Sequence, residues 1–422
     1  MKGNRLELVT IGDELLLGFT IDTNAAHIAR ALGEIGFEIV RRSTVGDSAG
    51  DIAAAVGDAL SRTGAVITTG GLGPTSDDLT KASIAGLFGR KMVMDENLLR
   101  EVEARWNRLW PGRHFPAPNR QQAEIPEGAE IIPNAHGSAP GIRLEDDAGR
   151  WVAMLPGVPR EMRGMLGEQI IPRLKSLAGG TVILSKTLRT AGIGESAIAE
   201  VLGANPLDGV PSAAMLALAF LPSALGVDLR VTVRGLLRED SEEILAAAAL
   251  KLRERIEAYV YGEGDADLAE SVLALCRSRR LTVAVAESCT GGMLGQRLTA
   301  VPGSSDVFRG GIIAYDNQVK EQLLGVDHAT IAENGAVSVE TAAAMASGAR
   351  QRLGASVGIG ITGIAGPGGG TAEKPVGTVC VAIDGDGITS ARSLRLIGDR
   401  EEIRQRSAQS ALDMLRRALI TV

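Results

Sequence analysis

The sequence predicts an α/β protein with two parallel-sheet domains and a smaller α+β segment between them. Residues 5–172 alternate short β-branched runs with amphipathic stretches, and the alternation resumes at Asp265, a pattern typical of parallel sheets covered by helices. Glycine-containing breaks occur at Ala178-Gly179-Gly180 and at Gly262-Glu263-Gly264, the second of which is predicted to be a linker. A chain of 422 residues is too long for one ordinary core. We expect three domains, at residues 1–178, 179–262 and 265–422.

The elements of the first domain follow from its β-branched runs and from its amphipathic periodicity. The predicted strands are Arg5–Ile11, Glu38–Arg42, Val66–Thr69 and Trp151–Leu155. The predicted helices are Thr23–Leu32, started by Asp22 or Thr23, then Ser48–Arg62, Asp77–Phe88, Asn97–Trp110 and Arg160–Ser176. Loops are expected where prolines or glycines interrupt the pattern, at Pro111–Pro118 and Asn134–Gly141.

The same criteria apply to the rest of the chain. In the middle segment they predict a strand at Val182–Leu188, a short helix after Gly194, extended runs at Ala213–Phe220 and Gly226–Val233, and a helix at Glu242–Ala258. In the last domain the predicted strands are Val283–Glu287, Arg309–Tyr315, Val357–Thr362 and Pro375–Ile383. The predicted helices are Asp267–Arg279, Met293–Ala300, one near Lys320–Leu324, Glu340–Leu353 and Glu401–Leu419.

Composition argues against several function classes. Lysine and arginine total 44 against 51 aspartate and glutamate, and the pI is near 5.4, so no positive field is available to hold nucleic acid. The cysteines Cys276, Cys289 and Cys380 show no metal-type spacing and are too few for a disulfide framework. No signal peptide and no run of about 18 apolar residues is recognisable. We expect a soluble cytoplasmic protein without nucleic-acid or membrane partners.

A strand-to-helix turn in the last domain carries hydroxyl groups. The apolar strand Val283–Glu287 runs into Ser288-Cys289-Thr290-Gly291-Gly292 and then into a helix. Glycines let backbone N–H groups approach a ligand, and a helix N-terminus favours an anion or a developing oxyanion, so the turn suits acyl chemistry. The alternative is that Ser288 and Thr290 only cap the helix. Cys289 suits packing better than nucleophilic attack, because no histidine is placed to activate it.

Lys320 is the candidate base for this turn. Ligands of open α/β sheets bind outside the carboxyl ends of the strands, where Ser288, the strand end at Ala314–Asn317 and the loop at 362–370 are expected to meet. Lys320 lies about one turn into the next helix. Desolvation in apolar surroundings lowers the pKa of a lysine until the neutral amine can accept a serine proton. The alternative is an ordinary solvated helix lysine.

The ordered motifs of this domain resemble the CinA C-terminal (PncC-type) family. The motifs are Glu287–Gly292 (ESCTGG), Pro302–Ser305 (PGSS), Gly310–Tyr315 (GGIIAY) with Lys320, Gly335–Ser338 (GAVS), Thr362–Pro367 (TGIAGP) and Lys374–Val379 (KPVGTV). The resemblance implies a nicotinamide-nucleotide amidohydrolase that forms nicotinate mononucleotide and ammonia and needs no cofactor. It makes Ser288 the nucleophile, Lys320 its base and Tyr315 a partner in the same network. It assigns oxyanion donors to the Gly291/Gly292 turn. It assigns substrate binding to that turn and to Thr290, Ser304, Ser305, Thr362, Gly363 and Arg400.

A second glycine-rich loop follows the third predicted strand of the first domain. Thr69–Asp78 (TGGLGPTSDD) ends in paired carboxylates, and Asp13 and Glu14 follow the first strand. Three or four carboxylates are therefore expected to meet beside a phosphate-binding loop, and hard oxygen ligands of this kind suit Mg²⁺ or a similar divalent ion. The alternative is that Asp77 and Asp78 simply start a helix.

This domain resembles the doubly wound molybdopterin-binding (MoaB/MogA-like) fold. Further motifs narrow the resemblance to the CinA N-terminal domain: Asn119–Ala123 (NRQQA), Asn134 with Gly137–Gly141 (GSAPG), and Leu155–Met162 (LPGVPREM). Thr190–Ser196 (TAGIGES) looks like the KH-like middle domain of the same proteins, so the resemblance spans essentially the whole chain. It implies a metal-dependent ADP-ribose pyrophosphatase. Its metal candidates are Asp13, Glu14, Asp77 and Asp78, and its phosphate-binding candidates are Gly70, Gly71, Gly73, Thr75 and Ser138.

The resulting hypothesis is a bifunctional enzyme of pyridine-nucleotide salvage. It would deamidate nicotinamide mononucleotide in the C-terminal domain and hydrolyse ADP-ribose to AMP and ribose 5-phosphate in the N-terminal domain, with a Mg, Mn or Co type ion at the second site only. One alternative is that the N-terminal domain binds a pterin or a nucleotide without turning it over. A competence or DNA-repair factor, which the family name suggests, finds no support in the charge balance. The middle domain lacks a basic loop, so we expect a spacer or dimerisation role and a homodimer.

Overall fold

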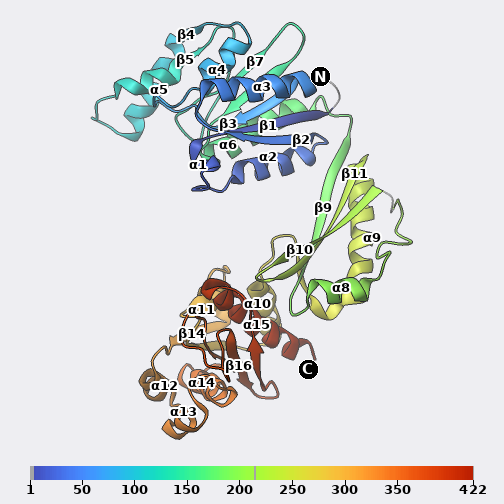
Figure 1. Cartoon of the computed structure of the whole chain (residues 1–422), viewed down its shortest axis with the longest axis vertical. Coiled ribbons are helices and arrows are strands. Elements are labelled where there is room, and N and C mark those ends of the chain that lie inside the picture. Colours follow the sequence, from blue (N-terminus) through green and yellow to red (C-terminus); the bar gives the residue numbers. More distant parts are fainter. Residues whose placement is uncertain (1–3, 213–214, 422) are drawn as a thin grey trace. The chain divides into compact units, whose positions relative to one another are not determined.

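The computed structural model describes residues 4–212 and 215–421 (Figure 1). The chain divides into two compact units, Met1–Leu184 with Val233–Glu243, and Ser185–Thr232 with Ile244–Val422. The predicted middle domain is thus shared between the two units. No helix in the described part of the chain is long and apolar enough to cross a membrane.

The first unit is built on a six-stranded sheet with the order β2-β1-β3-β8-β7-β6. The strands β1 (Arg5–Ile11), β2 (Glu38–Val45), β3 (Ala65–Thr69) and β8 (Trp151–Leu155) are parallel. The strands β7 (Gly141–Glu145) and β6 (Glu130–Ile132) complete the sheet in antiparallel pairing. Every residue of β3 and β8 is buried, as expected for central parallel strands with both faces covered.

Alternate residues of these strands feed two separate cores. Val66 and Val152 pack with the residues of α3 (Ala49–Thr63), α4 (Thr80–Leu87) and α5 (Glu96–Leu109). Ala65 and Ala153 pack on the other face with α2 (Thr23–Gly33), α6 (Pro159–Met165), the π-helical turn η2 (Leu166–Ile170) and α7 (Ile171–Lys175). Figure 1 shows α2 and α3 on opposite sides of the sheet. This arrangement confirms the doubly wound prediction.

Several short elements of this unit were not predicted. They are α1 (Asp13–Leu16), the 3-10 helix η1 (Ala117–Ala123), the pair β4 (Met92–Met94) and β5 (Glu124–Pro126), and the strands β6 and β7. Pieces of three to seven residues carry too little periodicity to be recognised. The predicted helix start at Asp77 is also wrong. Helix α4 begins at Thr80, because the Asp78 carboxylate is engaged within the preceding loop.

The middle segment forms a four-stranded sheet with the order β10-β11-β9-β12. Its elements are β9 (Thr181–Thr190), α8 (Glu195–Leu202), β10 (Leu216–Ser223), β11 (Gly226–Leu237), α9 (Arg238–Ile256), η4 (Glu257–Tyr259) and β12 (Val260–Glu263). The first two positions of the predicted run 213–220 lie outside the described residues. The predicted linker at Gly262 is instead the end of a strand, since β12 pairs antiparallel with β9.

The C-terminal sheet has the order β14-β13-β15-β16-β17. The strands β13 (Val283–Glu287), β14 (Phe308–Ile313) and β15 (Val357–Gly363) are parallel. Two antiparallel pairings then follow, between β15 and β16 (Thr378–Gly385) and between β16 and β17 (Ser390–Arg395). After two reversals β17 runs in the direction of β15. The carboxyl ends of β13, β14, β15 and β17 therefore share one edge of the sheet.

Helices cover both faces of this sheet. On one face lie α10 (Leu268–Ser278), α11 (Met293–Thr299) and α15 (Arg400–Thr421). On the other lie α12 (Asn317–Leu324), α13 (His328–Asn334) and α14 (Val339–Arg352), while the 3-10 turn η5 (Ser304–Asp306) precedes β14. Gly358 and Gly360 let α14 approach β15 closely, because a Cβ at these positions would lie 2.0 Å and 2.2 Å from the carbonyl oxygens of Ala346 and Ala342.

Candidate active site

A cavity of about 180 Å³ opens at the carboxyl edge of the C-terminal sheet. Four of the chain segments that reach it follow or end a strand that terminates there, namely β13, β14, β15 and β17, and a fifth segment, Ala336 with Val337, lies between α13 and α14. The residues that line it are Ser288, Cys289, Tyr315, Asn317, Lys320, Ala336, Val337, Thr362, Gly363, Ala365 and Arg400. The structure thus brings together six of the residues singled out in the sequence: Ser288, Tyr315, Lys320, Thr362, Gly363 and Arg400.

Lys320 is buried in this cavity wall. Only 1% of the residue is exposed, and its Nζ donates a hydrogen bond to the carbonyl oxygen of Tyr315 at 3.1 Å. Burial lowers the pKa of the Lys320 amine, and the negative charge of Asp316 opposes that shift only in part. The alternative of a solvated helix lysine is therefore wrong. A lysine in this state supplies a neutral amine more readily than a surface lysine does.

Ser288 is held in place through its backbone. Its N–H donates to the carbonyl oxygen of Ile361 on β15 at 2.9 Å, and the residue is 7% exposed. The capping alternative is wrong for both hydroxyls, because α11 begins after Gly292 without any side-chain cap. The buried Thr290 hydroxyl has no hydrogen-bond partner within the described ranges. The Ser288 side chain is therefore left for another purpose.

The neighbouring thiol is not a competing nucleophile. Cys289 is buried, and burial raises the pKa of its thiol to about 12. A thiol with this pKa stays protonated at neutral pH, and the thiolate is the nucleophilic form. Cys289 is therefore a packing residue, as its sequence context indicated.

Glu287 anchors the turn that carries Ser288, a role that the sequence reasoning missed. Its carboxylate is 1% exposed and accepts hydrogen bonds from the amides of Gly292 (3.0 Å), Leu294 (3.1 Å) and Gly295 (2.8 Å). These are the amides that a helix start leaves without partners. The available signal was an acidic residue at the end of an otherwise apolar strand.

The same contacts correct the predicted oxyanion donors. The Gly292 amide donates to Glu287, and the Gly291 amide donates to the carbonyl oxygen of Ser288 at 3.1 Å. Both glycines are needed for conformation instead, with φ of 59° and 96°. The amides of Cys289 and Thr290 donate to no acceptor in the part of the chain that the structure describes. They are the donors that remain for an oxyanion.

Ser304 and Ser305 do not line this cavity, which corrects their assignment to the substrate. They form the turn η5 just before β14, which is parallel to β13. A segment that enters a parallel strand lies at the opposite edge of the sheet from the segments that leave it.

Arg400 and Tyr315 lie at the exposed side of the cavity. Tyr315 is 64% exposed, and its hydroxyl accepts a hydrogen bond from the Arg400 Nη2 at 3.4 Å. The Arg400 Nη1 donates to the carbonyl oxygen of Gly366. The hydroxyl of Thr362 donates to the carbonyl oxygen of Ala336 at 2.7 Å. Arg404, which was not predicted, donates to the carbonyl oxygen of Thr290 at 2.9 Å. An anionic group of a ligand would find Arg400 at this opening.

Substitution of Glu287 by glutamine is expected to disturb this turn. The side-chain amide can accept hydrogen bonds through one oxygen only, so at least one buried N–H loses its partner and the free energy of unfolding falls by about 2 kcal/mol or more. Chemical denaturation measures this loss. Glu270→Gln, on the exposed side of α10, is the control and should unfold like the unsubstituted protein. Equal stability of the two variants would contradict the anchoring role.

The glycine-rich loop of the first unit is closed by one of its own carboxylates. Asp78 accepts hydrogen bonds from the amides of Gly73 (2.7 Å) and Thr75 (2.8 Å) and from the Thr75 hydroxyl. The hydroxyl of Thr80 donates to the carbonyl oxygen of Gly70 at 3.0 Å. Gly71 has a φ of 65°, which glycine adopts without strain. Asp78 therefore holds the loop and does not stand free as a ligand.

The four predicted metal ligands do not gather at one point. The Asp13 carboxylate accepts from the amide of Asp47 at 3.2 Å, and the Asp47 carboxylate accepts from the amide of Asp13 at 3.0 Å, which ties α1 to the end of β2. Glu14 lines a separate cavity, and Asp77 is exposed. Across residues 4–212 and 215–421, no group of three or more His, Cys, Asp or Glu side chains is arranged to hold a metal ion. The expected convergence is thus not observed.

A cavity of about 100 Å³ lies at the carboxyl edge of this sheet. Asn24 at its wall donates through Nδ2 to the Thr69 hydroxyl (3.2 Å) and to the carbonyl oxygen of Gly157 (2.7 Å). Its buried Oδ1 has no partner within the described ranges. None of the five predicted phosphate-binding residues lines this cavity, namely Gly70, Gly71, Gly73, Thr75 and Ser138. Ser138 instead accepts from Gln122 Nε2 at 3.4 Å.

Lys81 is a further residue that the sequence reasoning missed. It follows the loop in α4, is 3% exposed, and donates through Nζ to the carbonyl oxygen of Gln121 at 2.6 Å. Burial lowers the pKa of the Lys81 amine to about 8, although Glu124 and Asp78 act in the opposite sense. The only available signal was its position directly after the TSDDLT segment.

Each of the three parts of the chain matches a model of a known protein family. Residues 265–419 match the family model of the CinA C-terminal domain, residues 7–176 that of a probable molybdopterin binding domain, and residues 185–262 that of the damage-inducible protein CinA KH domain. A CinA-like protein of Gemmatimonas aurantiaca is 60% identical over 98% of this chain and 96% of its own length. A CinA-like protein of Frankia casuarinae is 45% identical over the same shares. A putative competence-damage inducible protein of Moorella thermoacetica is 43% identical over 98% of both chains.

Proposed function

Because the chain belongs to the CinA family, we propose that its C-terminal domain is a nicotinamide-nucleotide amidohydrolase, which converts nicotinamide mononucleotide to nicotinate mononucleotide and ammonia. The resemblance of the motifs supplies the substrate. The observation that carries the proposal is that Ser288 and the buried Lys320 line one cavity. A hydroxyl and a desolvated amine that line one cavity are the two groups that serine–lysine acyl transfer needs.

In the proposed reaction, neutral Lys320 accepts the proton of the Ser288 hydroxyl as its Oγ attacks the amide carbon of the pyridine. The tetrahedral intermediate then collapses, and the amide nitrogen takes the proton from Lys320 and leaves as ammonia. A water molecule, deprotonated by the same amine, hydrolyses the resulting ester and frees the Ser288 hydroxyl. Two moderate barriers thus replace one high barrier. The lowered pKa of Lys320 supports its role as the base.

The rest of the site has distinct roles in the proposal. The amides of Cys289 and Thr290 are the proposed oxyanion donors, in place of the two glycines. Arg400 would bind the phosphate of the nucleotide, because its guanidinium lies at the opening of the cavity beside Tyr315. Glu287 touches no substrate in this scheme and positions the turn through three backbone amides.

For the N-terminal domain we propose hydrolysis of ADP-ribose to AMP and ribose 5-phosphate, with a divalent ion as cofactor. The proposal rests on the resemblance of the glycine-rich loop and its neighbouring motifs. The described carboxylates do not form a metal-binding group, so no reaction step is assigned to the ion. The same observation favours the second candidate, a domain that binds a pterin or a nucleotide without turning it over.

One experiment on the whole protein tests both proposals. The protein is incubated with nicotinamide mononucleotide and with ADP-ribose, with added Mg²⁺ or with EDTA, and ammonia and AMP are quantified. We expect EDTA to stop AMP release and to leave ammonia release unchanged, since the serine–lysine route uses no ion. Binding of ADP-ribose without AMP release under every metal condition would establish the binding module instead. Loss of ammonia release in EDTA would contradict the proposed C-terminal mechanism.

A further inference from the structure

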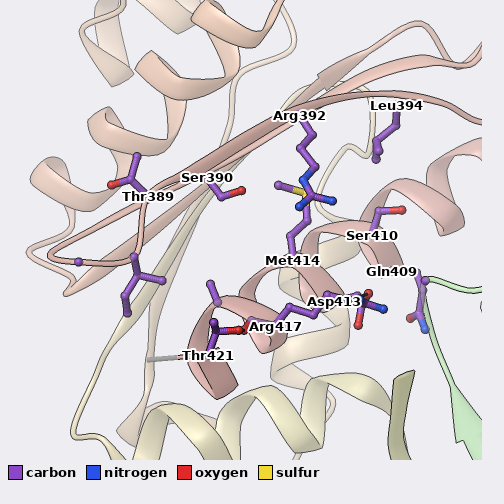
Figure 2. Close-up of a pocket in the computed structure, with 14 residues that line it drawn as sticks. Thr389, Ser390, Arg392, Leu394, Gln409, Ser410, Asp413, Met414, Arg417 and Thr421 are labelled. Carbon is purple, nitrogen blue, oxygen red and sulfur yellow. Dashed lines mark hydrogen bonds and ion pairs between the residues drawn. The ribbon is translucent and has the colours of Figure 1, made fainter. Parts of the chain in front are cut away.

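One cavity of the second unit has no part in either proposed reaction. It has a volume of about 530 Å³ and lies between the second half of α15, the strand β17 with the turn before it, and the backbone at Gly192 (Figure 2). Its volume falls in the range of about 300–1,000 Å³ that is typical of small-molecule sites. Ser390, Arg392 and Leu394 point into it from alternate positions of β17, as side chains on one face of a strand do.

The charge in this cavity is positive. Asp413 is neutralised by two arginines, since it accepts from Arg416 at 2.8 Å and from Arg417 Nε at 2.7 Å. Arg417 also donates to the carbonyl oxygen of Ala191 at 3.2 Å. Arg392 is exposed, and no carboxylate in the described part of the chain forms an ion pair with it. The guanidinium of Arg392 is therefore available to an anion.

Gln409 presents a hydrogen-bond acceptor that lacks a donor. The residue is 5% exposed, and its Nε2 donates to the carbonyl oxygen of Leu225 at 2.7 Å. A carbonyl oxygen can only accept, so this bond fixes which end of the amide faces Leu225. The buried Oε1 of Gln409 is left without a partner among residues 4–212 and 215–421. Buried polar atoms are normally paired, so this oxygen points to a ligand that supplies an N–H or O–H group.

The cavity also offers apolar contacts. Met414 on α15 and Leu394 on β17 both line the cavity, and Figure 2 shows Arg392 extending from the strand toward Met414. Methionine is flexible and polarizable and packs well against a flat ring. The lining contains no histidine, cysteine or lysine, and its one carboxylate is paired. The cavity is therefore equipped for binding and not for catalysis.

From these features we infer that the cavity is a binding site for a nucleoside monophosphate. The phosphate contacts Arg392 and the Ser390 hydroxyl, the base packs against Met414 and Leu394, and an N–H of the base donates to Gln409 Oε1. Neither proposed reaction requires this site. The ligand is held by a charge-assisted contact at one end and by a neutral hydrogen bond at the other.

Photolabelling of the whole protein with 8-azido-AMP, followed by mass spectrometry of its peptides, tests the inference. We expect label on peptides that contain 388–394 or 409–421, and we expect excess AMP to remove it. Adenosine lacks the phosphate and ribose 5-phosphate lacks the base, so each should compete at least about tenfold less well than AMP. Label that appears only in other parts of the chain, or equal competition by adenosine, would overturn the inference.

Two arginine variants on the edge strand β17 locate the phosphate. Arg392→Ala should reduce label on these peptides by about tenfold, because it removes the charge-assisted contact. Arg395→Ala is the matched control. Arg395 lies three residues after Arg392 on the same strand, so its side chain points to the opposite face of the sheet, where it lines a different cavity. This variant should leave the label unchanged. Both side chains are exposed, and thermal unfolding verifies that both variants fold. Equal labelling of the two variants would refute the assignment of the phosphate to Arg392.

Discussion

Replacement of Ser288 by alanine is expected to abolish release of ammonia from nicotinamide mononucleotide. The substitution removes the atom that is proposed to form the acyl-enzyme, and no other group of the cavity can replace it, because the Cys289 thiol has a pKa of about 12 and stays neutral. Loss of an essential nucleophile lowers kcat by a factor on the order of 10⁴ or more. A coupled ammonia assay under saturating substrate measures the change.

The fold should tolerate this substitution. Ser288 is held by its backbone N–H through the bond to Ile361, and alanine retains that bond. The thermal unfolding midpoint should therefore stay within the spread of replicate measurements. Ser278→Ala, which removes an exposed hydroxyl from α10, is the matched control and should keep full activity. Normal turnover by Ser288→Ala would remove the serine mechanism altogether.

Replacement of Lys320 by methionine is expected to separate stability from activity. Methionine has a similar length, fills the buried site and cannot accept a proton, so kcat should fall by a factor between about 10² and 10⁴. The same change removes an amine whose charged form is disfavoured by burial, so the thermal unfolding midpoint at neutral pH should rise. Lys320→Arg keeps a permanent charge and should lose both activity and stability. Full activity in either variant would show that Lys320 is not the base.

The pH dependence of the unsubstituted protein should follow the same amine. The pKa of Lys320 is lowered in the folded state from the ordinary 10.5. At pH values between the folded-state pKa and 10.5, the unfolded chain therefore binds more protons than the folded chain. The free energy of unfolding should therefore rise with pH across that window, and the advantage of Lys320→Met should shrink there. The kcat/KM for deamidation should rise as the neutral amine forms, with its midpoint below 10.5. A profile that stays flat through that window would contradict this assignment.

The sequence pattern was most informative for long elements with strong periodicity. The strands Arg5–Ile11, Trp151–Leu155 and Val283–Glu287 have the bounds that were predicted, and α2 begins after Asp22, one of the two residues expected to start it. These elements depend on local properties, such as β-branching, apolar alternation and capping, that neighbouring residues alone determine. Short strands such as β6 and β12 depend on partners far away in the chain, which no local pattern encodes.

The partners of polar atoms were the least predictable feature of the sites. Asp77 and Asp78 were expected to begin a helix or to bind a metal. The Asp78 carboxylate instead accepts hydrogen bonds from two amides and a hydroxyl of its own loop. Gly291 and Gly292 were expected to donate to an oxyanion, but their amides are taken by Ser288 and Glu287. Distances of a few tenths of an ångström decide such competition, and residue spacing does not contain that information.

By itself the amino-acid sequence determined the family, the α/β class, and the turn that carries Ser288, because periodicity and ordered motifs are properties of the chain. Only the tertiary structure decided which residues share a cavity. Strand direction placed Ser288, Tyr315, Thr362 and Arg400 at one edge and Ser304 and Ser305 outside the cavity. Burial then converted Lys320 from an ordinary lysine into a candidate base, since desolvation depends on the neighbours that folding brings around a side chain.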